Sequence, residues 1–295
     1  MRRSAFFLAV ALAGTTAFPA GGQPVLVETP FLEAAVKAGT LPPVAARVPA
    51  QPNIAVLEKH GKSLGRHGGK LHLLMGKQKD TKMMMVYGYA RLISYDENLN
   101  FVPDLLADFD VQDQRIFTFR LRKGHKWSDG HPFTAEDFRY YWEDMATNTE
   151  ISSKGLPQAL LVRGKRPTFE VLDETTVRYT WSESNPNFVP WIARPRPLLL
   201  YRPAHYLKQF HAKYADEAKL KAAARKENKR NWANLHGDRD RWYRMDNPAR
   251  PTLQPWLNST KPPSERFIFK RNPYYHRVDK NGRQLPYIDN VVLNL

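Results

Sequence analysis

A change in hydrophobic period between positions 116 and 145 is the feature that most constrains the fold of this chain. From 116 to 122 the apolar residues Phe117, Phe119 and Leu121 alternate with polar ones. This period of two predicts a strand with one buried face. Asp129 and Gly130 follow and predict a turn. We therefore expect a strand that leads through a tight turn into a different element.

The element after the turn is predicted to be a helix. Thr134 stands where a helix N-cap belongs and Asp137 follows three residues later, a spacing typical of a capping box. Apolar side chains then recur at intervals of three and four residues, which predicts a helix that buries one stripe against a sheet. The stripe consists of Phe138, Tyr141, Trp142 and Met145.

Other segments give shorter signals of the same kind. Two alternating runs on either side of residues 173–175 predict a hairpin between 168 and 181. Short apolar runs between 70 and 95 predict strands or a helix, and the opening 28–43 predicts one short helix that stops before Pro42. Strands mixed with helices, without a regular repeat, favour an α/β or α+β fold.

Composition excludes several classes of protein. With 15 Phe, 7 Trp and 13 Tyr, the 295-residue chain can build a core, so wholesale disorder is excluded. The absence of Cys excludes a disulfide framework, a zinc ribbon, an iron–sulfur cluster, a thiol nucleophile and a lipid attached through cysteine.

The first 23 residues have the plan of a secretory signal peptide. Arg2 and Arg3 precede an apolar run from Ala5 to Ala13, and small residues with Pro19 follow. We expect cleavage after Ala17 or a few residues beyond, export to the periplasm of a two-membrane bacterium, and no lipoprotein anchor. Removal of residues 1–23 takes away two Arg and no acid, so the net charge falls from +16 to +14. Residues 24–69, rich in Pro, Ala and Gly, predict an extended arm.

The sequence contains no recognisable catalytic or metal-binding motif. The sequence GKS at 61–63 lacks the glycine of a phosphate loop, because Val56 occupies that position. No nucleophile–base constellation is visible, so we predict no catalytic residue and no cofactor, with an exported hydrolase as the weaker alternative. The six-residue spacing of the histidine pairs 125/131 and 205/211 suits no metal geometry, and we predict no metal site.

The positive charge invites a nucleic-acid hypothesis, which export and the spread of the cations argue against. The densest run, at 218–230, predicts an exposed polar helix. We predict no nucleic-acid partner, and only nonspecific, salt-sensitive binding to anionic surfaces.

Two blocks carry a resemblance to a known family. Residues 92–142, with PDLLADF, TFRLRKGHKWSDG and FTAEDF, closely resemble the extracytoplasmic solute-binding proteins of ABC importers, family 5. Residues 267–295, FIFKRNPYYHRVDKNGRQLPYIDNVVLNL, look like that family's strand, NPYY turn and YID strand. Members bind oligopeptides, dipeptides, nickel complexes, oligosaccharides or opines. Together with the opening 28–43, the blocks suggest the family's long-armed subgroup.

The resemblance implies an architecture. We expect a two-lobed α/β fold of the periplasmic-binding-protein type II, with a small inserted domain, cut off before the second lobe. The first lobe, incomplete, would comprise 70–95 and 183–295, and the inserted domain 96–182. The missing half of the cleft leaves a truncated, non-binding remnant as an alternative to a working binding protein.

The resemblance also implies a function without catalysis. The expected protein is a monomeric periplasmic component that captures an oligopeptide or related small solute by lobe closure and passes it to ABC permease subunits in the inner membrane. Aromatic side chains near the lobe-linking segments are the candidates for stacking on a peptide side chain or sugar ring, namely Tyr87, Tyr89, Trp191 and Trp256. The motif residues expected to hold the strand, turn and helix are Trp127, Asp129, Gly130, Thr134 and Asp137.

Overall fold

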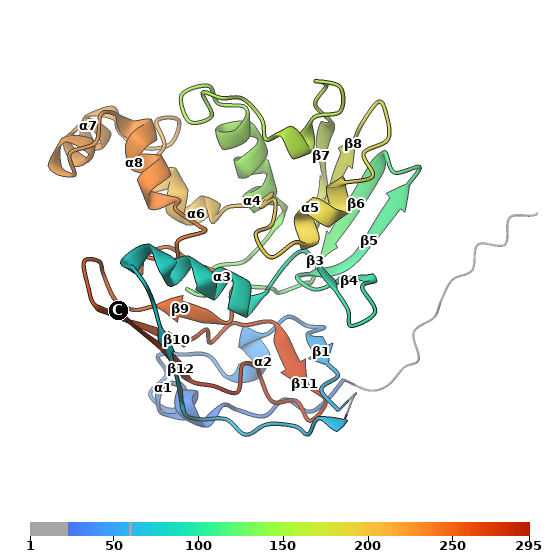
Figure 1. Ribbon diagram of the computed structural model, residues 1–295, viewed down its shortest axis with the longest axis vertical. Coiled ribbons are helices and arrows are strands. Elements are labelled where there is room, and N and C mark those ends of the chain that lie inside the picture. The colour runs from blue at the N-terminus through green and yellow to red at the C-terminus, as the bar shows by residue number, and fades with distance from the viewer. Residues whose placement is uncertain (1–22, 59–60) are drawn as a thin grey trace, which may run out of the picture.

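The computed structural model describes residues 23–58 and 61–295, so the predicted signal peptide lies outside the described residues except for Gln23. The chain forms two parts that lie one above the other in Figure 1, with α3 between them. The helices are η1 (Pro30–Leu32), α1 (Glu33–Lys37), α2 (Val44–Arg47), η3 (Gln78–Lys82), α3 (Met83–Gly88), α4 (Ala135–Arg139), η4 (Tyr140–Ala146), η5 (Gln158–Leu160), α5 (Phe188–Ala193), α6 (Ala204–Leu207), η6 (Lys208–Phe210), α7 (Glu217–Lys226) and α8 (Trp232–Arg239). The strands are β1 (Asn53–Ala55), β2 (Lys70–Leu74), β3 (Ile93–Tyr95), β4 (Phe101–Pro103), β5 (Leu106–Gln112), β6 (Ile116–Leu121), β7 (Thr168–Asp173), β8 (Thr176–Thr180), β9 (Trp256–Asn258), β10 (Arg266–Arg271), β11 (Arg277–Asp279) and β12 (Asn290–Asn294).

The upper part is built on an antiparallel sheet in the order β5-β6-β8-β7. The predicted strand is β6, where Phe117, Phe119 and Leu121 are buried as expected. The predicted hairpin is β7–β8, with Phe169 opposite Tyr179. Both predictions are confirmed because each element carries its own local alternating pattern.

The predicted helix packs against this sheet. It begins at Thr134 with the expected capping box, and its stripe of Phe138, Tyr141, Trp142 and Met145 is buried. The α-helical part ends at Arg139 and continues as the π-helix η4. The widened turn keeps the stripe inside the core, where the Trp142 ring lies edge-on to Tyr179 with 6.0 Å between centroids.

The core of the upper part extends beyond β8. Phe188 of α5 is fully buried, with its ring centroid 4.9 Å from Phe117 and 4.6 Å from Trp181. Leu200 and Leu207 belong to the same cluster. The predicted boundary at 182/183 between inserted domain and first lobe therefore falls within one continuous hydrophobic core, and the division into domains stays a prediction.

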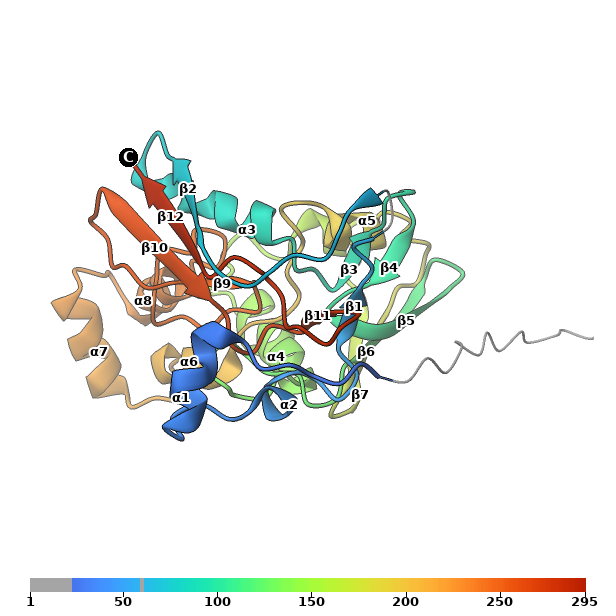
Figure 2. The ribbon, with the colours of Figure 1, turned by 90° about the horizontal axis from the view of Figure 1, so that it is seen from below.

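The lower part is built on a mixed sheet in the order β2-β12-β10-β9. β12 pairs in parallel with β2 and antiparallel with β10, so the segment 290–294 lies between strands from both ends of the chain. Figure 2 shows β2, β12 and β10 side by side. A second, smaller cluster, with Met84, Phe267 and Phe269, joins this sheet to α3.

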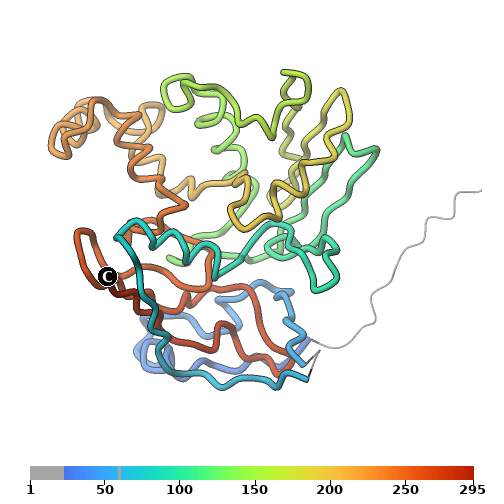
Figure 3. Tube along the Cα trace, in the orientation of Figure 1, coloured from blue at the N-terminus to red at the C-terminus, as the bar shows by residue number. Residues whose placement is uncertain are grey.

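The N-terminal arm wraps the lower part, as the trace in Figure 3 shows. It contains the predicted short helix as α1, and also α2 and β1, which were not predicted. Arg47 of α2 is buried and donates two hydrogen bonds to the Glu28 carboxylate. Strand β1 pairs in parallel with β11, so the arm is joined to the body by backbone hydrogen bonds as well.

The run at 218–230, predicted to be an exposed polar helix, is helical as far as Lys226, where α7 ends. With α8, it lies at the end of the upper part that is opposite to the β5-β6-β8-β7 sheet (Figure 1). Across residues 23–58 and 61–295, no helix combines the length and the apolar character that a bilayer crossing requires.

Candidate functional site

Helix α3 lies where the two parts of the chain meet, and its C-terminal end is fixed by close packing. A Cβ atom on Gly88 would lie 2.6 Å from Gln254 Oε1 and 2.8 Å from Pro255 Cδ, so only glycine fits. Tyr89 then ends the helix with a left-handed backbone, at φ 41°. The side-chain amide of Gln254 donates to the Ala90 carbonyl at 3.0 Å, which anchors the chain after the helix to the lower part.

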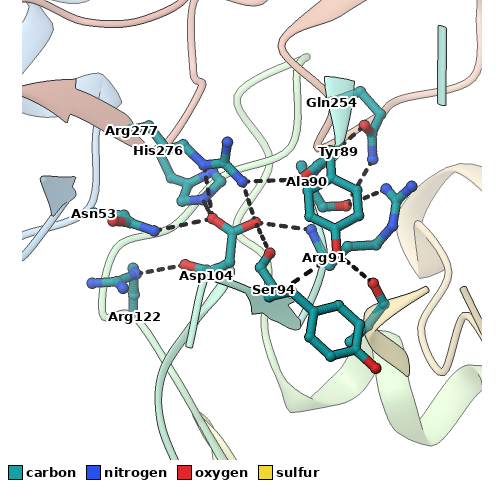
Figure 4. Close-up of polar contacts among 12 residues, drawn as sticks. Asn53, Tyr89, Ala90, Arg91, Ser94, Asp104, Arg122, Gln254, His276 and Arg277 are labelled. Carbon is teal, nitrogen blue, oxygen red and sulfur yellow. Dashed lines mark hydrogen bonds and ion pairs between the residues drawn. The ribbon is translucent and has the colours of Figure 1, made fainter. Parts of the chain in front are cut away.

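A buried carboxylate, Asp104, accepts hydrogen bonds from three other segments of the chain at this junction (Figure 4). It is 1% exposed. Oδ1 accepts from Asn53 at 3.0 Å, from His276 Nε2 at 2.7 Å and from Arg277 Nε at 2.8 Å. Oδ2 accepts from the backbone N–H of Arg91 at 2.9 Å, from Ser94 Oγ at 3.3 Å and from Arg277 Nη2 at 2.6 Å. We call these six residues the Asp104 network.

The charges in this network are set by burial and by pairing. Burial alone would raise the pKa of Asp104, but the Arg277 guanidinium and His276 hold that pKa well below its usual range. Burial lowers the pKa of His276 despite the neighbouring carboxylate. His276 is therefore neutral at neutral pH and donates its Nε2 proton, so the network is an ion pair of Asp104 and Arg277.

Arg91 connects the network to the surface beside α3. Its side chain is 1% exposed, and burial lowers its pKa to about 10. The guanidinium donates to the carbonyls of Met85 at 2.9 Å and Arg194 at 3.1 Å, and also to that of Pro195. Arg91 thus ties α3 to the loop after α5.

These two segments form the walls of a pocket of about 400 Å³. We call it the α3 pocket. Its lining comprises Lys82, Met83, Met85, Val86, Pro195, Arg196 and Tyr243. Apolar side chains of α3 face two cationic side chains, and the Arg196 guanidinium lies 4.9 Å from the centre of the Tyr243 ring. The pocket can take a molecule that carries both apolar surface and negative charge.

Three of the four predicted ligand-contacting aromatics lie on or near these walls. Tyr87 is on α3 with 54% of its surface exposed. The hydroxyl of Tyr89 donates to the carbonyl of Ala193 at 2.7 Å, at the end of the helix that carries Trp191. The Trp191 ring is covered by the Arg194 guanidinium at 3.7 Å. Trp256 points elsewhere: its Nε1 donates to the Ile288 carbonyl at 2.9 Å, and its ring packs on the core of the lower sheet.

The five motif residues contact one another and residues of α6. The Asp137 carboxylate accepts from Trp127 Nε1 at 3.0 Å, from the Thr134 N–H at 3.1 Å and from the Ala204 N–H at 3.0 Å. Gly130 has a left-handed backbone, at φ 89°, within the turn. Burial raises the pKa of Asp137 to about 7, because its partners are uncharged donors.

The histidines of the pairs 125/131 and 205/211 lie in two kinds of surroundings. His131 and His205, one from each pair, stack with 3.8 Å between ring centroids, and His205 bonds the Asp129 carboxylate at 2.8 Å. His125 and His211 are buried. Within the described ranges, no group of three or more His, Cys, Asp or Glu side chains has a geometry that could hold a metal ion.

The sequence did not reveal the Asp104 network as a unit. Asp104 and Arg277 both lie in the blocks that carry the family resemblance, yet nothing in either block shows that they meet. The separation of 173 positions leaves no periodic signal. Arg91 was likewise unmarked, because a single arginine among apolar residues predicts no particular partner.

Comparisons with known proteins agree with this architecture. Residues 100–295 match the model of the bacterial extracellular solute-binding proteins, family 5 Middle. The solved structure of an oligopeptide-binding protein OppA superposes with a TM-score of 0.82 and 32% identity, over 92% of this chain and 41% of that one. The MelB structure from Agrobacterium fabrum C58, in complex with stachyose, shares the fold with a TM-score of 0.69 over 95% of this chain and 44% of that one. The chain belongs to the family 5 solute-binding proteins.

Curated relatives are binding proteins as well. The periplasmic alpha-galactoside-binding protein of Rhizobium meliloti is 28% identical over 279 residues, which cover 86% of this chain and 37% of the relative. The periplasmic oligopeptide-binding protein OppA of Escherichia coli is 34% identical over 107 residues, 32% of this chain and 19% of the relative. The family is one of binding proteins, in agreement with the prediction that the chain is not an enzyme. This chain thus spans less than half the length of the relatives it matches.

Proposed function

We propose that the chain acts in the periplasm as the solute-binding component of an ABC importer and takes up oligopeptides. The family match and the named relatives support solute binding. The predicted signal peptide supports export, and the absence of cysteine supports a protein without a lipid anchor. Its partners would be the solute and permease subunits of the inner membrane, with the binding protein a monomer.

The observation that carries the proposal is the α3 pocket. Lys82 and Arg196 place two positive charges beside the apolar side chains of α3, a combination that suits a peptide carboxylate and a neighbouring apolar side chain. The Trp191 ring is already covered by Arg194, so a sugar ring would have to displace the guanidinium before it could stack there. This favours an oligopeptide over an oligosaccharide.

A thermal-shift screen of the purified protein tests the solute class. The arms are a mixture of short peptides, an α-galactoside and a nickel complex, each added at the same concentration. A ligand at about a hundred times its Kd stabilises the native state by about 2.7 kcal/mol, which raises the Tm measurably. We expect the peptide arm alone to shift. An unchanged Tm in all three arms would contradict solute binding, and a shift with the α-galactoside alone would reassign the solute.

Substitution of the exposed aromatic residue on α3, next to the pocket-lining Val86, tests the site. Tyr87→Ala should weaken peptide binding without unfolding the protein, because that side chain is largely exposed. Leu172→Ala on β7 is the matched control, since Leu172 is also exposed, at 43%, and lies on the sheet of the upper part. Equal peptide affinity in the two variants would remove Tyr87 from the site.

Cell fractionation tests the location. The protein should be released with the periplasmic contents, and N-terminal sequencing should show that the chain begins between Phe18 and Pro24. An unprocessed N-terminus in the cytoplasmic fraction would contradict export.

A further inference from the structure

A second pocket lies between α7 and α8, in the part of the chain that projects from the body in Figures 1 and 2. Its volume is about 270 Å³. Lys221, Arg225, Lys229 and Arg230 line it, against a single carboxylate from Glu217. None of these residues lines the α3 pocket, so the feature is independent of the proposed solute site.

Within residues 23–58 and 61–295, two of the four cations have no counterion. Lys221 pairs with Glu217 at 2.6 Å, and Lys229 pairs with Asp238 at 3.0 Å. Among the residues that the structure describes, neither Arg225 nor Arg230 has a side chain that forms a hydrogen bond or ion pair. The pocket therefore holds two guanidinium groups whose donors are available to a ligand.

Apart from Asn231, the rest of the lining is apolar. Leu220 and Ala224 are buried beneath the pocket on α7. The Trp232 ring lies 4.7 Å from the His211 ring, and its Nε1 donates to Glu150 at 2.9 Å. An apolar floor strengthens the attraction between an anion and the neighbouring guanidiniums, because it excludes part of the water that would screen them.

We propose that this pocket binds a phosphate group through Arg225 and Arg230. A guanidinium offers two parallel N–H donors that match two phosphate oxygens, which makes arginine better suited than lysine to this group. Both the headgroup of an anionic phospholipid and free phosphate carry this chemistry. The two sources are separated by experiment.

A matched pair of double variants isolates the pocket from net charge. Arg225→Gln with Arg230→Gln removes two charges from the pocket. Lys219→Gln with Lys226→Gln removes two charges from the opposite face of α7, since these positions lie about half a turn away from the pocket face at 3.6 residues per turn. Both pairs are exposed, so neither change is expected to disturb packing.

Binding is measured at about 150 mM salt, where the diffuse attraction of exposed charges is screened. One arm sediments the protein with phosphatidylcholine vesicles, with and without an equal part of phosphatidylglycerol. The other arm titrates inorganic phosphate by calorimetry. We expect wild type and the variant with both lysines replaced to bind alike in at least one arm. The variant with both arginines replaced should bind at least about tenfold more weakly. Binding in the vesicle arm alone identifies the lipid, and binding in the phosphate arm identifies the free anion.

Equal loss in both double variants would show attraction by net charge and overturn the proposal. So would the absence of binding in both arms. If the arginine variant loses its circular dichroism signal, Arg225→Lys with Arg230→Lys replaces it. That variant keeps both charges but not the paired donors, and unchanged affinity in it would also overturn the proposal.

Discussion

Two buried aspartates, Asp104 and Asp137, differ sharply in their surroundings. Asp104 is 1% exposed and faces the Arg277 guanidinium, whereas Asp137 is 3% exposed and faces only an indole and two backbone N–H groups. The pKa of Asp104 is therefore held well below its usual range, while that of Asp137 is raised to about 7. Burial alone raises a carboxyl pKa, and a charged partner reverses the direction.

The two carboxylates also act over different distances along the chain. Two of the three donors to Asp137 lie within ten positions, in the strand, turn and helix motif. Every side-chain donor to Asp104 except Ser94 lies more than fifty positions away. Asp137 stabilises a local motif, and Asp104 joins the arm, the upper part and the lower part.

The largest effect is expected for Asp104→Asn. The change leaves the Arg277 charge without its carboxylate in a buried site, which costs about 3–5 kcal/mol of unfolding free energy. Urea denaturation at neutral pH measures it. Asp108→Asn is the control, because Asp108 pairs with Arg120 at an exposed position, where such a pair contributes about 1 kcal/mol or less. Similar losses in the two variants would show that the Asp104 network is not a stabilising centre.

A smaller loss is expected for Arg91→Lys, which tests whether the Asp104 network supports the α3 pocket. Lysine cannot reach the carbonyls of Met85, Arg194 and Pro195 together, and the unmet acceptors should cost about 1–3 kcal/mol. Amide hydrogen exchange should become faster at Arg194, Arg196 and Leu198, the residues of this segment that carry a backbone N–H. Unchanged exchange there would show that the Asp104 network does not support the α3 pocket.

Asp137→Asn should cost about 1–2 kcal/mol at neutral pH, in the range of a lost cap and hydrogen bond. Asparagine keeps one acceptor oxygen for three donors, but it leaves no buried charge unpaired. The loss should be smaller than that of Asp104→Asn in the same urea titration. A larger loss would reverse the ranking of the two sites.

The smallest expected effect is the pH dependence of the unfolding free energy that Asp137→Asn and Asp104→Asn each remove. The folded-state pKa of Asp137 is raised, so its contribution is fully present below the unfolded value of 3.8 and is lost as the pH rises toward about 7. The cost of Asp137→Asn should therefore be greater at about pH 5 than at about pH 8. The pKa of Asp104 is lowered, so its contribution is fully present above 3.8 and is lost only at lower pH.

Between those two pH values the Asp104 carboxyl does not titrate, so it adds no pH dependence of its own to the cost of Asp104→Asn. His125 and His276 do add one, because the Asp104 carboxylate raises their pKa in wild type and the Asn variant removes that effect. A cost of Asp137→Asn that rises with pH would mean that the folded-state pKa of Asp137 is not raised.

The sequence predicts what depends on near neighbours. β6, the capping box at Thr134, the β7–β8 hairpin and α7 were all expected, since each has its own local pattern. The switch to a π-helix at Tyr140 was not, because the spacing of the stripe fits both kinds of turn. Local patterns predict only a mixture of strands and helices, and the family resemblance was needed to predict which fold they form.

The candidate site was predicted only in part. Aromatic residues near the expected lobe-linking segments were chosen by type, and three of the four lie on α3 or beside it. Nothing in the sequence shows that Arg194 covers Trp191 or that Trp256 faces the lower sheet. The Asp104 network and the pocket between α7 and α8 arise from the meeting of distant segments. Such contacts have no periodicity of their own.

The position of β12 between β2 and β10 sets an order in time for the growing chain. The β5-β6-β8-β7 sheet can form as soon as residue 180 has been made, because all four of its strands lie between 106 and 180. β2 must wait until residues 290–294 exist, since Lys70 finds its partner only at Asn290. Until then its backbone offers an open edge to any other strand. A chain bound for export would thus benefit from a holding partner that covers residues 70–74 during synthesis.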